Sequence, residues 1–305
     1  ETCRRVAPKL EIHLSTQQSL SNWKAVKYWK EEGLHRVVLA REVGAEEMQK
    51  MKEEVDIEIE AFVHGAMCIA YSGRCVLSNH MTARDSNRGG CCQSCRWDYD
   101  LYENKDGEEV PLFEEGDAPF AMSPKDLKLI ESIPHMIELG IDSLKVEGRM
   151  KSIHYVATVI SVYRKVIDAY CADPDNFQIK KQWLEELSRC AIRATASAFF
   201  ESEPSYKQQM FGFHASKPKW DFAGLVLDYD AETQMVTMEQ RNYFKPGDTV
   251  EFFGPDIETF QMTVGELWDE EGNELDVARH PLQILKFKVD RPLYQYNMMR
   301  KKNKK

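Results

Sequence analysis

Long apolar runs are absent from this sequence of 305 residues, and no stretch approaches the roughly 18 consecutive apolar residues that a membrane-spanning helix needs. Its first residues lack the basic-then-apolar pattern of a secretory signal peptide. An excess of positive charge is absent too, because 40 basic and 50 acidic side chains give a formal net charge of −10. This balance excludes a polycation that coats nucleic acid. We therefore expect a cytoplasmic protein with no membrane partner, in which any RNA contact is local.

Several common catalytic motifs are also missing. The sequence contains no His-Glu-x-x-His metalloprotease motif, no Gly-x-Ser-x-Gly nucleophile elbow and no Gly-Lys-Ser/Thr phosphate loop. A nucleophilic pair of Cys68 and His64 is conceivable, but a spacing of four residues within a loop does not indicate a hydrogen bond between them. The sequence therefore gives no mechanism for a peptidase.

Cysteine is scarce for a disulfide scaffold, with eight residues in the chain, but its distribution is uneven. Five cysteines fall within one segment: Cys68, Cys75, Cys91, Cys92 and Cys95. The other three are scattered, and we expect them to pack as small apolar side chains: Cys3, Cys171 and Cys190. In a reducing compartment such a cluster indicates a metal site or a catalytic site.

Four thiolates of the segment are candidates for one metal site: Cys68, Cys75, Cys95 and either Cys91 or Cys92. A four-thiolate set suits both a four-iron cluster and a zinc ion. The spacing is not that of the paired two-residue knuckles typical of structural zinc, so we favour the cluster over zinc and over metal-free thiols. Neighbouring glycines allow backbone amides to approach cluster sulfurs, and nearby arginines such as Arg74 favour thiolates.

Short apolar strands alternate with amphipathic helices in the first part of the chain. We expect strands at residues 10–14, 36–39, 55–62, 120–122 and 141–146. We expect helices at residues 20–29, 45–52, 152–170 and 182–193, and one that opens at 123–126 with a cap and a proline in its first turn. Such alternation predicts an α/β fold with a parallel sheet, and at this length a (β/α) barrel. A closed barrel of this kind needs about eight strands, and the chain has no initial methionine, so we expect an N-terminally truncated TIM-like barrel with three further units upstream.

Two further features complete the expected organisation. Residues 97–103 and 108–113 flank Asn104-Lys105-Asp106-Gly107, which predicts an inserted hairpin. Short alternating runs at 222–227, 235–239, 249–253, 260–267 and 284–289 predict a small all-β barrel. We divide the chain into a barrel portion at 1–200 that carries the cysteine loop and the ribbon, a linker at 201–219, a small β-barrel at 220–295 and a basic tail at 296–305. The tail has a composition suited to RNA contact, although a solvated tail explains it at least as well.

Charged residues near the predicted strand ends are candidates for catalysis and substrate binding. Glu60, His64 and Glu147 are candidate general acids or bases. Four cations are candidates for binding a carboxylated substrate: Arg84, Arg96, Lys145 and Arg149. Structural ion pairs explain these charges about equally well.

The segment Glu60–Ser78 reads Glu-x-Phe-x-x-Gly-Ala-Met-Cys-x-x-x-x-Gly-x-Cys-x-Leu-Ser. This run resembles the signature of the collagenase-like peptidase family of unknown catalytic type. The Arg84-Asp-Ser-Asn motif and the Cys91–Arg96 end are similar to the family branch that makes 5-hydroxyuridine at the tRNA wobble position with prephenate. The resemblance covers nearly the whole chain, including the C-terminal β-barrel.

The resemblance implies that Cys68, Cys75, Cys91 and Cys95 are the ligands of an iron-sulfur cluster inside the barrel. Because the Cys91-Cys92 doublet departs from the simpler spacing of the family, Cys92 remains an alternative to Cys91. The expected function is prephenate-dependent hydroxylation of tRNA, with tRNA and a small dicarboxylate as partners and a homologous partner subunit also considered. Two alternatives stay open, a collagenase-like endopeptidase and a non-catalytic RNA-binding protein with structural zinc.

Overall fold

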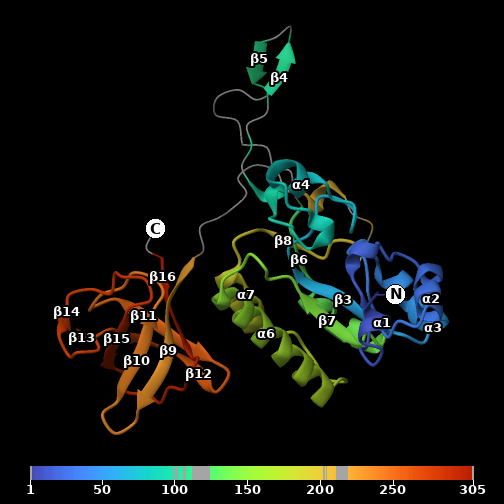
Figure 1. Ribbon diagram of the computed structural model, residues 1–305. Coiled ribbons are helices and arrows are strands. Elements are labelled where there is room, and N and C mark those ends of the chain that lie inside the picture. Colours follow the sequence, from blue (N-terminus) through green and yellow to red (C-terminus); the bar gives the residue numbers. More distant parts are fainter. Residues whose placement is uncertain are drawn as a thin grey trace. The chain divides into compact units, whose positions relative to one another are not determined.

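The computed structural model describes residues 2–97, 99, 102–105, 108–111, 124–201, 203, 205–210 and 219–303 (Figure 1). The described chain divides into two compact units. The first unit comprises Glu1–Trp183 and Ile192–Ser216, and the second comprises Leu184–Ala191 and Lys217–Lys305. The first is a mixed α/β unit with a largely parallel sheet, and the second is an antiparallel β unit.

The sheet of the first unit has six strands: β1 His13–Leu14, β2 Arg36–Val38, β3 Glu58–Gly65, β6 Asp126–Lys128, β7 Ser143–Val146 and β8 Thr195–Ala196. Strand β1 pairs in parallel with β2, β2 with β3, and β3 with β7. Strand β6 is antiparallel to the end of β3 and parallel to β8. The parallel core is confirmed, but the pairing of the described strands does not close the sheet into a barrel.

Seven α-helices lie in the described chain: α1 Thr2–Val6, α2 Trp23–Glu31, α3 Ala45–Glu54, α4 Leu77–Thr82, α5 Ile133–Glu138, α6 Ile153–Ala172 and α7 Lys181–Cys190. Helix α2 begins where the side chain of Asn22 accepts a hydrogen bond from the amide of Ala25 at 3.0 Å. Ser152 caps α6 in the same way through the amide of Tyr155. None of the described helices is long and apolar enough to cross a membrane.

The prediction that a helix begins at residues 123–126 is wrong. Asp126–Lys128 forms strand β6, and α5 begins only at Ile133. The amide of Asp126 donates to the carbonyl of Ala194 at 2.9 Å, so pairing with a distant strand holds this segment extended. Tertiary pairing has therefore overridden the local capping signal. The strand expected at 120–122 lies outside the described residues.

The inserted hairpin is confirmed, but Asn104 and Lys105, which we expected in its turn, belong to its first strand. Strand β4, Tyr102–Lys105, pairs antiparallel with β5, Glu108–Pro111, and Lys105 lies opposite Glu108. The two residues between the strands, 106 and 107, lie outside the description. A two-residue connection with Asp and Gly is the turn that favours a tight hairpin.

The second unit is an eight-stranded antiparallel sheet: β9 Trp220–Asp230, β10 Met235–Gln240, β11 Thr249–Gly254, β12 Ile257–Thr263, β13 Leu267–Trp268, β14 Glu274–Leu275, β15 Ile284–Lys288 and β16 Met298–Lys302. The strand order is β12-β11-β16-β9-β10-β15-β13-β14, which does not confirm a closed barrel. Alternate side chains such as Val236, Met238, Leu285 and Phe287 are fully buried and form its core. The five predicted strands are present, whereas β13, β14 and β16 were not predicted.

Strand β16, Met298–Lys302, occupies half of the segment 296–305 that we expected to be a basic tail. It pairs with both β9 and β11. Arg300 is completely buried, with Nε 2.8 Å from Glu251 and Nη2 2.9 Å from Glu186. Lys301 pairs with Asp248 at 3.2 Å. Arg300 is thus a structural residue of the second unit and is not available to an RNA phosphate.

Candidate metal centre

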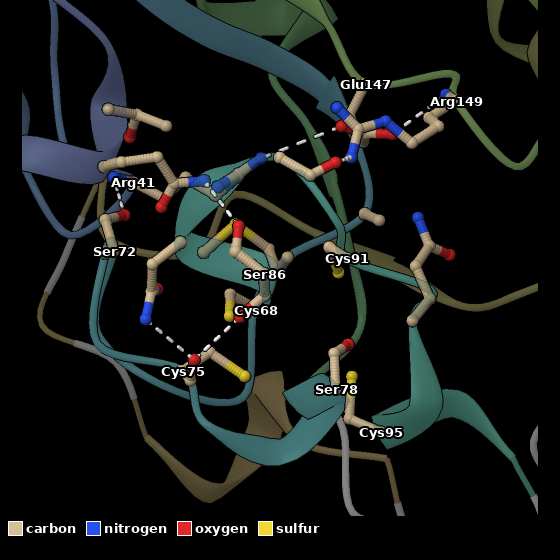
Figure 2. A pocket seen from close by; sticks show the side chains of 18 of the residues that line it. Arg41, Cys68, Ser72, Cys75, Ser78, Ser86, Cys91, Cys95, Glu147 and Arg149 are labelled. Atoms are coloured by element: carbon tan, nitrogen blue, oxygen red, sulfur yellow. Dashed lines mark hydrogen bonds and ion pairs between the residues drawn. The ribbon is translucent and has the colours of Figure 1, made fainter. Parts of the chain in front are cut away.

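A cavity of about 510 Å³ lies in the first unit beside the carboxyl ends of the parallel strands (Figure 2). Each of these strands is followed by residues that line the cavity: Ser15 after β1, Arg41 after β2, Cys68 after β3 and Glu147 after β7. The carboxyl ends of parallel strands meet at one edge of a sheet, which is where ligands bind in α/β proteins. The cysteine segment thus begins at the edge of the sheet where ligands bind in this class of fold.

Four of the five clustered cysteines line this cavity: Cys68, Cys75, Cys91 and Cys95. Cys92 is not among the residues that line it. The sulfur of Cys92 lies instead 3.3 Å from the hydroxyl of Thr82 and 3.4 Å from that of Ser78. The cysteine doublet is therefore divided, with one thiol at the cavity and the other held by hydroxyl groups. Of the scattered cysteines, Cys190 is buried as expected, but Cys3 and Cys171 are exposed.

The four cavity thiols influence one another electrostatically. Burial raises the pKa of Cys68 to about 11, and a neighbouring thiolate at Cys75 would raise it further. Burial also raises the pKa of Cys95, and the nearby Cys91 and Cys75 contribute to that rise. The four thiols line one cavity, and a positively charged metal group there would favour their thiolate forms.

The spacing of possible ligands bears on the kind of metal group. Within the described ranges, no group of three or more His, Cys, Asp or Glu side chains is arranged to hold a metal ion. Zinc requires its four thiolate sulfurs at about 2.3 Å from one point. A four-iron cluster takes the same four thiolates, each on a different iron, and so needs them further apart.

Hydrogen bonds fix the loop that carries Cys68 and Cys75. The Ser72 hydroxyl accepts from the amide of Arg41 at 3.1 Å, and the Ser86 hydroxyl donates to the carbonyl of Cys75 at 2.7 Å. Gly73 has φ +74°, and a Cβ atom there would collide with the carbonyl of Gln17. Only glycine allows the loop to pack this closely against the segment after β1.

A buried ion cluster fixes the end of the cysteine segment. Arg96 donates to Asp126 at 2.6 Å, and it also donates to the carbonyl of Met67 at 3.1 Å. Lys151 lies 3.3 Å and Arg193 4.0 Å from the same carboxylate. Burial alone would raise the pKa of Asp126, but the cations, Arg96 foremost, lower it below its usual value. Arg96 lines the cavity, yet its guanidinium is engaged in this structural cluster.

Arg41 is a cavity residue that the sequence analysis missed. Its guanidinium lies 3.9 Å from the centre of the Phe62 ring and 3.9 Å from Glu147. Burial lowers its pKa, while the nearby Cys68 and Glu147 oppose that change. The sequence contained one indication of this role, because Arg41 comes soon after the predicted strand at 36–39. Residues that follow parallel strands lie at the edge of the sheet where ligands bind.

The three candidate acid–base residues differ in whether they line the cavity. Glu147 lines the cavity, whereas Glu60 and His64 do not. Burial would raise the pKa of Glu60, but hydrogen bonds from Lys145 at 2.7 Å and Ser143 at 2.9 Å lower it. His64 is 5% exposed, and its Nδ1 lies 3.1 Å from the hydroxyl of Tyr163.

The four candidate substrate-binding cations also differ in whether they line the cavity. Arg96, Lys145 and Arg149 line the cavity. Lys145 is paired with Glu60, and Arg149 donates to the carbonyl of Gly89 at 2.7 Å. Arg84 is exposed and is not among the residues that line the cavity.

His64 makes stability dependent on pH. Burial lowers its pKa from 6.5 to about 4, so the unfolded chain binds a proton more readily than the folded chain. Its contribution is complete above pH 6.5 and is lost as the pH falls toward 4. Between pH 7.5 and 5 we expect the free energy of unfolding to fall by about 2 kcal/mol more in the wild type than in His64→Gln, as measured by urea denaturation. Equal losses in the two proteins would contradict this.

The comparisons with known proteins cover both units. Residues 1–210 match the family model "Peptidase family U32", and residues 218–300 match "Peptidase family U32 C-terminal domain". The crystal structure of the C-terminal domain of a U32-family protein from Geobacillus thermoleovorans is 68% identical, covers 27% of this chain and 92% of that chain, and has a TM-score of 0.27.

Three relatives illustrate the range of names in this family. The chain is 75% identical over 301 residues to "tRNA hydroxylation protein P1" of Bacillus subtilis, covering 99% of this chain and 71% of that protein. It is 31% identical to "tRNA hydroxylation protein P" of Escherichia coli, covering 89% of this chain and 68% of that protein. It is 35% identical to a "Collagenase" of Porphyromonas gingivalis, covering 85% of this chain and 64% of that protein. With both units matched by family models, this chain belongs to peptidase family U32.

Proposed function

We propose that this protein hydroxylates the wobble uridine of tRNA to 5-hydroxyuridine, using an iron-sulfur cluster held by Cys68, Cys75, Cys91 and Cys95. The observation that carries the proposal is the gathering of these four thiols on one cavity at the binding edge of the parallel strands. Two relatives, one of them 75% identical, are named as tRNA hydroxylation proteins. A bound cluster would supply electron-transfer chemistry at this position.

We propose a cluster in place of zinc at these thiols. Four thiols line one cavity of about 510 Å³, and their sequence spacing is not that of the paired knuckles typical of structural zinc. Cys91 is the better third ligand because Cys92 does not line the cavity and its sulfur is held by the hydroxyls of Ser78 and Thr82. The alternative is a non-catalytic RNA-binding protein with structural zinc. Metal analysis distinguishes zinc from an iron-sulfur cluster.

The remaining cavity residues suit an anionic co-substrate, and we propose prephenate in this role. Five basic residues line the cavity: Arg41, Arg88, Arg96, Lys145 and Arg149. Glu147 is the single acidic residue among the described lining residues, and we assign it as the candidate general acid or base. The positive charge of these residues would attract carboxylates to the cavity.

We propose that a second cavity receives the nucleobase. It measures about 440 Å³, shares Met67 and Cys68 with the first cavity, and is also lined by Tyr71 and Phe199. Tyr71 is 73% exposed, and an exposed aromatic ring is suited to stacking on an unpaired base. Because Cys68 borders both cavities, a uridine extruded from the anticodon loop would lie beside the thiol cluster.

A collagenase-like endopeptidase is the second candidate, favoured by the family name and by the Porphyromonas gingivalis relative. A thiol peptidase requires a base within hydrogen-bond reach of its nucleophile. His64 does not supply that base to Cys68, because it is buried against Tyr155 and Tyr163 and does not line the cavity. The geometry therefore supports hydroxylation better than proteolysis.

Nucleoside mass spectrometry of tRNA tests the proposed function. In a strain that lacks this gene and every homologous gene, 5-hydroxyuridine should be absent, and expression of the wild-type protein should restore it. Purified protein should not cleave casein or collagen. Cleavage that is lost in Cys68→Ala, with no restored 5-hydroxyuridine, would support the peptidase instead.

A further inference from the structure

Arg41 differs from the other cations of the cavity in how its charge is balanced. Lys145 pairs with Glu60 at 2.7 Å, and Arg96 pairs with Asp126 at 2.6 Å. Among the described residues, Arg41 makes a single ion pair, a long contact of 3.9 Å with Glu147. Its Nε is buried and has no hydrogen-bond partner in the part of the chain that the structure describes.

The position of Arg41 is fixed although its charge is poorly matched. Its backbone amide donates to Ser72, and its guanidinium stacks on the ring of Phe62 at 3.9 Å. Only 13% of the side chain is exposed. Arg41 lines the cavity together with Cys68, and Figure 2 shows its guanidinium joined to Glu147 by a dashed line.

A buried guanidinium is costly unless charged or polar partners satisfy its donors. The five donors of arginine lie in a planar fork that matches the two oxygens of a carboxylate. A guanidinium that lines a cavity, is stacked in place and lacks close partners is therefore arranged to receive an anion.

We propose that Arg41 binds a carboxylate group of a small anionic co-substrate within the cavity, beside Cys68. The inference rests on the proposed function only in identifying that ligand as a co-substrate. An RNA phosphate is the less suitable anion, because only 13% of the Arg41 side chain is exposed. Glu147 is then a residue that holds Arg41 loosely and competes with the incoming carboxylate.

Calorimetric titration of anaerobically purified protein tests this assignment, with malonate as the minimal dicarboxylate and prephenate as the second probe. Arg41→Gln should weaken binding of both by about 10- to 100-fold, as expected for the loss of charge-assisted hydrogen bonds. Arg41→Lys should keep part of the affinity, because it retains the charge but loses the fork and the stacking. Arg164→Gln is the matched control, since Arg164 is 59% exposed and does not line the cavity, and it should change binding by less than about threefold.

The Glu147→Gln variant distinguishes a ligand-binding role of Arg41 from a purely structural role of Arg41. If Arg41 receives the anion, loss of the competing carboxylate should leave malonate binding equal or tighter. If Arg41 only supports the cavity through its contact with Glu147, the two variants should weaken binding alike, which would overturn the proposal. Unchanged binding in Arg41→Gln, no carboxylate binding by the wild type, or loss of iron in Arg41→Gln would overturn it as well.

The two proposals fail separately. Carboxylate binding that depends on Arg41, in a protein that does not restore 5-hydroxyuridine, would support the anion site and refute the hydroxylase. Restored 5-hydroxyuridine with malonate and prephenate binding unaffected in Arg41→Gln would do the reverse.

Discussion

Cys91→Ala is expected to lose its iron and acid-labile sulfide on anaerobic purification, whereas Cys92→Ala is expected to retain both. The two residues are adjacent, but only Cys91 lines the cavity. Removing one of four thiolates should lower iron occupancy by more than about tenfold, since even the loss of an outer-shell partner lowers metal affinity by about 10- to 100-fold. Cys68→Ala, Cys75→Ala and Cys95→Ala should behave like Cys91→Ala.

Cys171→Ala is the control for this series, because it removes an exposed thiol outside the cavity. Its iron and sulfide contents should equal those of the wild type. Equal losses in Cys91→Ala and Cys92→Ala would refute the division of the doublet. Stoichiometric zinc without sulfide in the wild type would refute the cluster and favour the structural zinc alternative.

Asp126→Ala is expected to have the second large effect, on stability. The carboxylate of Asp126 is the common partner of Arg96, Lys151 and Arg193, and the side chains of all four are 5–8% exposed. Without it, three buried cations lose their shared anion. Breaking a buried ion cluster in this way should lower the free energy of unfolding by about 3–5 kcal/mol, measured by urea denaturation.

Asp142→Ala provides the comparison for that measurement. Its carboxylate also pairs with a lysine, Lys52 at 2.9 Å, and accepts from the amide of Ile59 at 2.8 Å, but it is 34% exposed. We expect a loss of about 1 kcal/mol, as is typical for a partly exposed interaction. Asp126→Ala should also lower the iron content, because Arg96 follows Cys95 directly. Equal destabilisation by the two variants would contradict the role given to the buried cluster.

The parts of the fold that depend on local pattern could be predicted from the sequence. Apolar runs and helical spacing located β2, α3, β7 and α6 to within a few residues, and the Asn-Lys-Asp-Gly segment located the hairpin. The segment after residue 123 could not be predicted, because its extended form depends on pairing with β3 and β8. The burial of Arg300 likewise depends on Glu186 and Glu251, which are distant in the sequence.

In the candidate site, too, local features could be predicted and contacts between distant segments could not. The thiols could be found because they are clustered within one loop, but the pairing of Arg41 with Glu147 joins loops that follow different strands. Glu60 and His64 have the spacing of residues on one face of a strand. The register between β3 and β7 shifts between Phe62 and His64, and His64 packs against Tyr163 while Phe62 lines the cavity. Such a shift in strand register cannot be predicted from the pattern of apolar residues.

The most direct test of the proposed function compares the two adjacent cysteines by their effect on RNA. tRNA is isolated from the strain that lacks this gene and every homologous gene, after complementation with wild type, Cys91→Ala or Cys92→Ala at equal protein levels. Nucleoside mass spectrometry should find 5-hydroxyuridine restored by the wild type and by Cys92→Ala, and absent with Cys91→Ala. Absence of 5-hydroxyuridine with the wild type, or equal restoration by Cys91→Ala, would contradict hydroxylation by a cluster held in this cavity.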